Sequence, residues 1–111
     1  MDKIDKYREI IERVLTEYAV IPYAYGEIKS EPVFDRLRDS YLLVNVGWHK
    51  GRRMHGCLVH LDIIDGKIWI HRDGLEDGIA TDLEREGVPK SDIVLAFHEP
   101  ELRQFTEYAV V

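Results

Sequence analysis

Two tight turns constrain the fold of this chain more than any other feature of its sequence. Asp65-Gly66 separates two apolar, alternating runs, and Asp-Gly in that position is typical of a two-residue β-hairpin. Lys50-Gly51 separates an earlier pair of runs in the same way. Because side chains alternate between the two faces of a strand, each turn fixes by counting which residues face one another. The sequence therefore predicts an antiparallel meander.

Counting outward from Asp65-Gly66 gives four predicted pairs. On the inner face they are Ile63 with Ile68 and Leu61 with Ile70, and on the outer face Asp62 with Trp69 and His60 with His71. The same procedure across Lys50-Gly51 sets Val44 opposite Cys57 and Leu42 opposite Val59. All of these last residues are apolar or small, so the prediction places Leu42, Val44, Val46 and Trp48 on one face and assigns that face to the core.

Segments with helical periodicity precede and follow the predicted meander in the sequence. An apolar stripe runs through the N-terminal segment, which predicts an amphipathic helix capped by Asp2 and ended near residue 20 by Pro22. Residues 23–30 are expected to pass from loop into strand. A second helix is predicted over 76–86, with Ile79, Ala80 and Leu83 inward and Gly87 as its C-terminal cap. The apolar run 93–97 is expected to pack on the sheet, and 100–106 to form a helical turn.

The predicted fold class is α+β, with one domain over residues 1–111. An N-terminal helix packs on a four-stranded antiparallel meander sheet, and a second short helix and a C-terminal segment complete the core. The length and the 45% hydrophobic and 32% charged composition suit one globular core. We expect a cytoplasmic protein without a membrane segment, because the N-terminus lacks a leader pattern and a single cysteine, Cys57, cannot form an internal disulfide.

Charge limits the classes of partner. The net charge of −6 is the opposite of what a free-standing nucleic-acid binder carries, so direct DNA binding is not expected. Basic residues gather at one hairpin tip, where Lys50, Arg52 and Arg53 are candidates for contact with a phosphate or an acidic partner. The ordinary alternative is a solvated turn.

The most notable polar group is predicted on the outer face of the last hairpin. It comprises His60, Asp62, Trp69 and His71. Two imidazoles and a carboxylate suit a transition metal or acid–base chemistry, whereas a solvated sheet face needs neither. A large outer-face aromatic favours a binding surface for a partner, unless a helix of the same chain covers it.

Other candidate chemistry is weaker. Positions 55 and 57 share a strand face and 60 points away, so His55, Cys57 and His60 are not expected to share a metal, and Cys57 is expected to be a small buried hydrophobe. A glycine-rich phosphate loop, a nucleophile elbow and paired cysteines are absent from the sequence. The sequence therefore predicts no catalytic residues, no resident metal and no cofactor.

Several stretches together carry a family resemblance. They read VGW, GCLVHLDI, DGKIWI, RDG and VPKSDIVLAFH, between a helical DKIDKYREIIERVLTEYA and a C-terminal PELRQFTEYAV. With them the chain resembles the XisI family, the controlling factors of fdxN element excision in cyanobacteria. The resemblance implies a small, non-enzymatic α+β protein that acts with an XisH-like companion when a recombinase removes a DNA element. It carries over no catalytic residues.

Two further possibilities stay open at this point. One is a metal-dependent enzyme or nuclease accessory that uses His60, Asp62 and His71. The other is self-association into a homo-oligomer.

Overall fold

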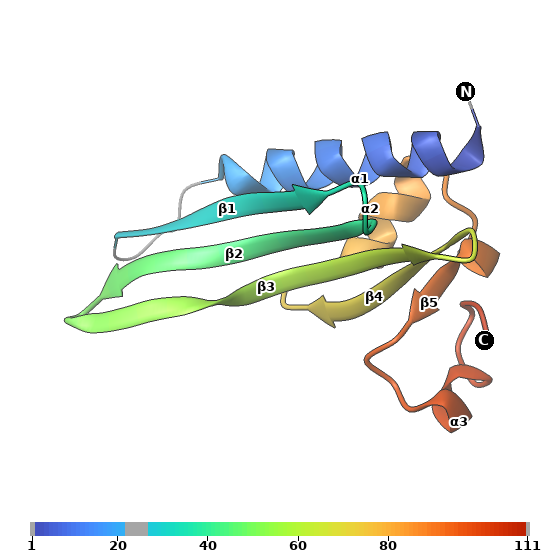
Figure 1. The fold of residues 1–111 in the computed structure, drawn as a ribbon. Helices are drawn as coiled ribbons and strands as arrows, with labels where there is room; N and C mark the ends of the chain where they lie inside the picture. The colour runs from blue at the N-terminus through green and yellow to red at the C-terminus, as the bar shows by residue number, and fades with distance from the viewer. Residues whose placement is uncertain (1, 22–26, 111) are drawn as a thin grey trace.

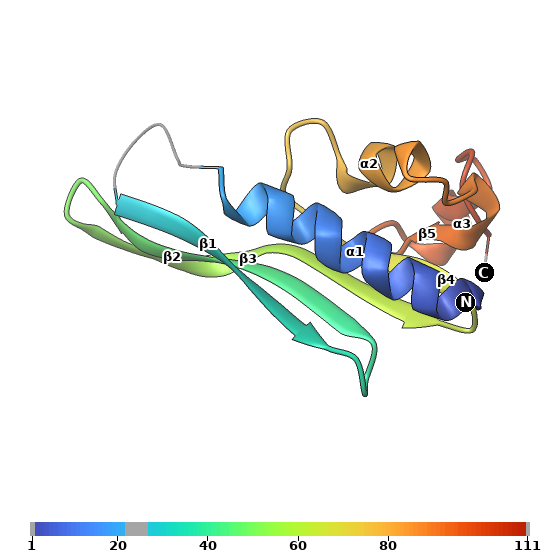
Figure 2. The ribbon, with the colours of Figure 1, turned by 90° about the horizontal axis from the view of Figure 1, so that it is seen from above.

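The sheet has five strands, and both longer helices lie on one side of it (Figures 1 and 2). The computed structural model describes residues 2–21 and 27–110. The strands are ordered β1-β2-β3-β4-β5 across the sheet. The elements are α1 (Lys3–Ala19), β1 (Glu27–Asp35), β2 (Ser40–His49), β3 (Arg52–Ile64), β4 (Lys67–Asp73), α2 (Ile79–Arg85), η1 (Lys90–Asp92), β5 (Ile93–Leu95) and α3 (Pro100–Arg103).

Helix α1 forms as the sequence predicts. Asp2 is its N-cap, and the Asp2 carboxylate accepts a hydrogen bond from the Asp5 backbone N–H at 2.8 Å. The helix ends at Ala19. Pro22 and the start of the predicted loop lie outside the described residues. The buried stripe that packs on the sheet consists of Tyr7, Ile10, Ile11, Val14 and Leu15.

Both predicted two-residue turns are confirmed. Lys50 and Gly51 have φ angles of 51° and 76°, and Asp65 and Gly66 have φ angles of 49° and 78°. Two consecutive positive φ angles define the turn whose twist matches that of the flanking strands, and glycine accepts this geometry without strain. These turns join β2 to β3 and β3 to β4.

The predicted pairs between β3 and β4 are confirmed for the residues nearest the Asp65-Gly66 turn. Ile63 pairs with Ile68, Leu61 with Ile70 and Asp62 with Trp69. The predicted pairing of His60 with His71 is wrong, because His60 pairs with Arg72 and the ladder resumes at Leu61 and Ile70. His71 is therefore an extra residue on β4, a β-bulge.

A second bulge changes the predicted core face of β2. Val44 pairs with Cys57 as predicted, but Val59 pairs with Leu43 and not with Leu42. Leu58 is the extra residue on β3. On β2 the side chains of Tyr41 and Leu43 are fully buried. The assignment of Leu42, Val44, Val46 and Trp48 to the core is thus wrong, since these four lie on the outer face, opposite the helices.

Cys57 shares that outer face. It was expected to be buried, but it is exposed, and its thiol donates a hydrogen bond to the Val59 carbonyl at 3.2 Å. The bulge at Leu58 explains the error, because it reverses the side to which all earlier residues of β3 point.

The C-terminal part adds a strand that the sequence analysis had described as a packing segment. Strand β5 pairs in parallel with β4, so the sheet has five strands and not four. Helix α2 begins at Ile79, later than predicted. The Asp73 carboxylate accepts hydrogen bonds from the N–H groups of Leu75 and Ile79 at 3.2 and 2.9 Å, and this contact sets the start of α2. Gly87 has a φ of 105°, which confirms it at the end of the helix.

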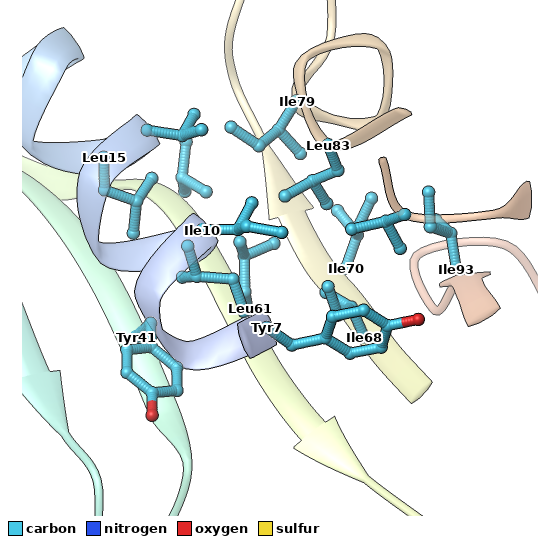
Figure 3. Close-up of a cluster of buried hydrophobic side chains, with 14 of the residues drawn as sticks. Tyr7, Ile10, Leu15, Tyr41, Leu61, Ile68, Ile70, Ile79, Leu83 and Ile93 are labelled. Carbon is cyan, nitrogen blue, oxygen red and sulfur yellow. The ribbon is translucent and has the colours of Figure 1, made fainter. Parts of the chain in front are cut away.

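The core lies between the inner face of the sheet and the two helices (Figure 3). Tyr7, Ile10 and Leu15 from α1 meet Leu61, Ile68 and Ile70 from the sheet, and α2 contributes Ile79 and Leu83. Apolar burial of this kind supplies most of the driving force for folding. None of the helices within residues 2–21 and 27–110 combines the length and the apolar character that crossing a bilayer requires.

Candidate functional site

Three of the four predicted outer-face residues converge at the bulged end of β3 and β4. His60 Nε2 lies 3.1 Å from Asp62 Oδ1, and His71 Nε2 lies 3.0 Å from Asp62 Oδ2. The two imidazole centroids are 4.8 Å apart. We call this group, His60, Asp62 and His71, the His–Asp cluster.

Local backbone geometry produces the His–Asp cluster. His60 and Asp62 are alternate residues of one strand, so both point to the outer face. Trp69 pairs with Asp62, and the bulge then places His71 beside the same carboxylate. Bulges commonly re-aim a side chain in this way. Sequence counting thus identified the right residues, although the ladder between His60 and His71 differs from the predicted one.

The His–Asp cluster is partly open to solvent. The side chains of His60, Asp62 and His71 are 36%, 22% and 35% exposed. A carboxylate without a proton only accepts hydrogen bonds, so each imidazole donates from Nε2. Two nitrogens of the same kind are therefore directed at one carboxylate, an arrangement that suits proton exchange. With the ring protons on Nδ1 instead, the same two nitrogens and the carboxylate suit cation binding.

Trp69, the fourth predicted residue, is covered by its own chain. Its ring centroid lies 5.4 Å from the Arg103 guanidinium of α3. Val94, which pairs with Trp69 across the β4–β5 ladder, is fully buried. The C-terminal segment therefore packs over this end of the outer face. For Trp69 the structure therefore supports the alternative in which a segment of the same chain, and not a partner, covers the side chain.

Trp48 is an aromatic residue of the outer face that the chain leaves uncovered. It is 51% exposed, and the Arg53 guanidinium lies 5.4 Å from its ring centroid. Val33, which pairs with Leu42, is 48% exposed. Together these residues make an apolar stripe across β1 and β2, and we use that name for Val33, Leu42, Val44, Val46 and Trp48.

Sequence analysis missed the apolar stripe as a surface. The alternation of β2 was recognised, but both of its faces carry leucine, so nothing in the pattern distinguishes a core face from an outer one. The informative signal was Trp48 beside the basic turn, since tryptophan next to Lys50 and Arg52 suits a surface better than a core.

The predicted basic residues occupy the far tip of the β2–β3 hairpin (Figure 1). Lys50, Arg52 and Arg53 are all exposed. No ion pair in the described part of the chain involves any of the three. We call them the basic tip. It lies beyond the end of β4, so it and the His–Asp cluster are separate features.

Two pockets of about 230 Å³ lie on other parts of the surface. One lies between α1 and α2 and is lined by Tyr18, Asp82 and Arg85, among others. The other is lined by residues of the long hairpin, including Asn45, Met54 and Gly56. The lining of these two pockets does not include the His–Asp cluster.

The fold and the site define a small α+β domain whose helices cover one face of a largely antiparallel sheet and leave much of the other face open. A family model described as XisI protein matches residues 1–110. The chain therefore belongs to the XisI family, which confirms the resemblance drawn from its sequence motifs.

Two solved structures are similar over the whole chain. A XisI-like protein from Anabaena variabilis ATCC 29413 is 35% identical, with a TM-score of 0.88, and the match covers 99% of this chain and 100% of that one. The fdxN element excision controlling factor XisI from the same organism is 32% identical, with a TM-score of 0.82 and the same coverage. A comparison with curated proteins finds no match.

Proposed function

We propose that this protein is a non-catalytic accessory factor in the excision of a DNA element, and that it acts by binding a companion protein of the XisH family. Membership of the XisI family supports the first part, because one similar structure is described as an excision controlling factor. The second part rests on the sequence resemblance and on the open outer face of the sheet.

The apolar stripe is the observation that carries this proposal. In the part of the chain that the structure describes, no helix lies over the outer side of β1–β3 (Figure 1). Trp48 and Val33 are about half exposed there, flanked by partly buried Leu42, Val44 and Val46. Contiguous exposed apolar surface with a tryptophan is typical of protein interfaces. We assign the companion to this face.

The neighbouring polar residues complete the proposed surface. The His–Asp cluster borders the apolar stripe, because His60 pairs with Leu42 across the β2–β3 ladder. Trp69 lies next to the His–Asp cluster and is partly exposed. The part of its ring that Arg103 does not cover contributes to the proposed surface. The basic tip adds charge at the other end. With a net charge of −6 on the whole chain, we assign the tip to acidic groups of the companion and not to DNA.

Co-purification with a co-expressed protein of the XisH family tests the proposal. The wild-type chain is expected to form a complex of fixed stoichiometry. Trp48→Ala and Val33→Glu are expected to weaken it by at least about tenfold, since a central interface residue contributes about 1–2 kcal/mol or more. Leu37→Ala is the matched control, because Leu37 is 93% exposed in the turn before β2.

Other results would contradict parts of the proposal. A companion that binds Trp48→Ala, Val33→Glu and wild type equally well does not use the apolar stripe. One that binds Trp69→Ala as tightly as wild type does not contact that residue. Sedimentation of the isolated chain as a dimer that Trp48→Ala dissociates would assign the stripe to a second copy instead. A salt-sensitive DNA complex lost in an Arg52→Ala, Arg53→Ala variant would assign the basic tip to DNA.

A further inference from the structure

We propose that the His–Asp cluster binds one divalent transition-metal ion, with Zn²⁺ as the best-matched ion. The ligand atoms of His60, Asp62 and His71 all lie within 4.8 Å of one another. In the described residues this is the group in which three such side chains come together. The inference concerns an ion site on this chain and does not depend on the companion proposed above.

The spacing of the donor atoms suits a tetrahedral ion. Imidazole nitrogens and carboxylate oxygens bind Zn²⁺ at about 2.0–2.2 Å, which places neighbouring donors about 3.3 Å apart in a tetrahedral site. In the cluster His60 Nε2 lies 3.1 Å from Asp62 Oδ1, and His71 Nε2 lies 3.0 Å from the other oxygen, Oδ2. One donor atom from each of the three residues lies within 4.8 Å of the other two. In the ion-bound form each ring carries its proton on Nδ1, which frees the Nε2 lone pair for the ion. Binding of an ion also needs a small shift of Asp62 and an approach of the two rings. Partly exposed side chains can make both movements.

The backbone holds these donors without help from a flexible loop. His60 and Asp62 lie on β3, which is paired on both sides. His71 lies at the bulge of β4, where the extra residue directs its ring toward Asp62. Sites built on strands keep their geometry better than sites built on loops. The bulge therefore has a function in this proposal, because it brings the second imidazole to the carboxylate.

The donor set selects the class of ion. Imidazole favours zinc and other late first-row metals, whereas Mg²⁺ and Ca²⁺ favour sites made wholly of oxygen. Two imidazoles and one carboxylate leave a fourth position for water or for a group of another molecule. The exposure of all three side chains gives an ion a direct path from solvent.

The alternative is a hydrogen-bonded cluster without an ion, in which Asp62 accepts from both rings. The two possibilities differ in a measurable way. A hydrogen-bonded cluster has no specific uptake of metal, whereas the proposed site takes up one ion per chain. Other potential ligands on the outer face, His55 and Cys57, are exposed and provide an internal comparison.

Titration of the chain with Co²⁺ tests the proposal. The chain must be purified without a histidine tag and freed of metal with a chelator. One Co²⁺ per chain is expected, with visible absorption bands of low-symmetry coordination, and Zn²⁺ is expected to displace it. A wild-type chain that shows no stoichiometric uptake of either ion would overturn the proposal.

Variants show where the ion binds. His60→Ala and His71→Ala are expected to lower the affinity for Co²⁺ at least about tenfold. Loss of a residue that only hydrogen-bonds to a metal ligand already has an effect of that order. Asp62→Asn keeps the side-chain shape and is expected to weaken binding in a chain whose circular dichroism matches wild type. The controls His55→Ala and Cys57→Ser are expected to retain the ion. Loss in the controls with retention in the cluster variants would place the ion elsewhere and overturn the proposal.

The two proposals can fail separately. Companion binding is measured with and without chelator, while metal uptake is measured on the isolated chain. A chain that binds Co²⁺ and no XisH-like protein would support the metal site alone. A chain that binds the companion and no metal would leave the proposed function intact and remove the metal site.

Discussion

The Tyr7 hydroxyl donates a hydrogen bond of 2.5 Å to Asp92 Oδ2 and so ties α1 to the turn that precedes β5. Lys3 reaches the same carboxylate oxygen at 3.0 Å. Burial and the neighbouring carboxylate both raise the pKa of Tyr7. Burial favours the protonated form of Asp92, but the hydrogen bonds from Tyr7 and Lys3 outweigh that effect and lower its pKa. The contact therefore joins α1 to η1 around a carboxylate that favours its ionised form.

Removing the Tyr7 hydroxyl is expected to destabilise the fold without changing its packing. Tyr7→Phe should lower the free energy of unfolding by about 1–2 kcal/mol, because a hydrogen bond to a charged group is lost while the ring stays in the core. Urea denaturation measures the loss. A double-mutant cycle with Asp92→Ala should give a coupling of similar size, and additive effects would show that the two groups do not interact.

Asp39 is expected to make the free energy of unfolding depend on pH in the acidic range. The Arg8 guanidinium binds both its carboxylate oxygens, at 2.7 and 3.0 Å, and these bonds hold the pKa of Asp39 below its usual value. An unfolded aspartate has a pKa of about 3.9, so the folded state takes up this proton less readily. The stability from this contact is fully present above that value and is lost as the pH falls through the lower, folded pKa.

The variant Asp39→Asn removes the charge of this side chain without disturbing the backbone conformation at residue 39. Asp39 has a φ of 54°, and asparagine accepts that conformation as well as aspartate does. The variant is expected to be about 1–2 kcal/mol less stable at neutral pH, with a smaller further loss on acidification. Denaturation at a series of pH values measures both. Asp77→Asn, at an exposed position, is the control. Parallel acid profiles for wild type and Asp39→Asn would contradict the assignment.

Two glycines of the long hairpin form a matched pair for testing the sheet. A Cβ atom at Gly47 would lie 1.9 Å from the Glu27 carbonyl oxygen, whereas one at Gly56 meets no atom within 4 Å among the described residues. Gly47→Ala should therefore force β1 away from β2 and destabilise the fold by at least about 2 kcal/mol. Gly56→Ala should change stability by less than about 1 kcal/mol. Equal thermal midpoints for the two variants would show that β1 is not held at Gly47.

Turn chemistry accounts for what the sequence predicts well. Lys50-Gly51 and Asp65-Gly66 each favour one turn geometry, so the antiparallel order of β2, β3 and β4 follows from local residues. Ile63, Leu61 and Asp62 lie close to their turn, and their partners were predicted correctly. The prediction fails where it is extended beyond a bulge, because the residue that leaves the ladder leaves no mark in an apolar pattern.

Leu58 and His71 show why those errors had different consequences. Leu58 lies among apolar residues, so its bulge exchanged the predicted core and outer faces of β2. His71 was predicted on the same face as Asp62 and in the neighbouring pair, so the cluster was identified although its pairing was not. Strand β5 was missed as a strand because three residues carry too little periodicity, and its partner β4 lies in an earlier part of the chain.

The contact between Arg103 and Trp69 leads to a prediction about the edge of the outer face. Arg103 is 8% exposed, and its guanidinium donates hydrogen bonds to the carbonyls of His98 and Ala96 at 3.1 and 3.4 Å. It therefore folds the C-terminal segment back while it covers the Trp69 ring. Arg103→Ala is expected to loosen that segment and to destabilise the chain by about 1–2 kcal/mol, through lost hydrogen bonds and a lost cation–π contact.

Fluorescence can follow this change, because the chain has two tryptophans and Trp48→Phe leaves Trp69 as the sole reporter. In that background, Arg103→Ala should shift the emission of Trp69 to longer wavelength and make it easier to quench with acrylamide. Leu102→Ala, at a neighbouring position that is 50% exposed, is the control and should leave both unchanged. If Arg103→Ala also strengthens companion binding, the segment limits access to Trp69, whereas unchanged quenching would show that Arg103 does not cover the ring in solution.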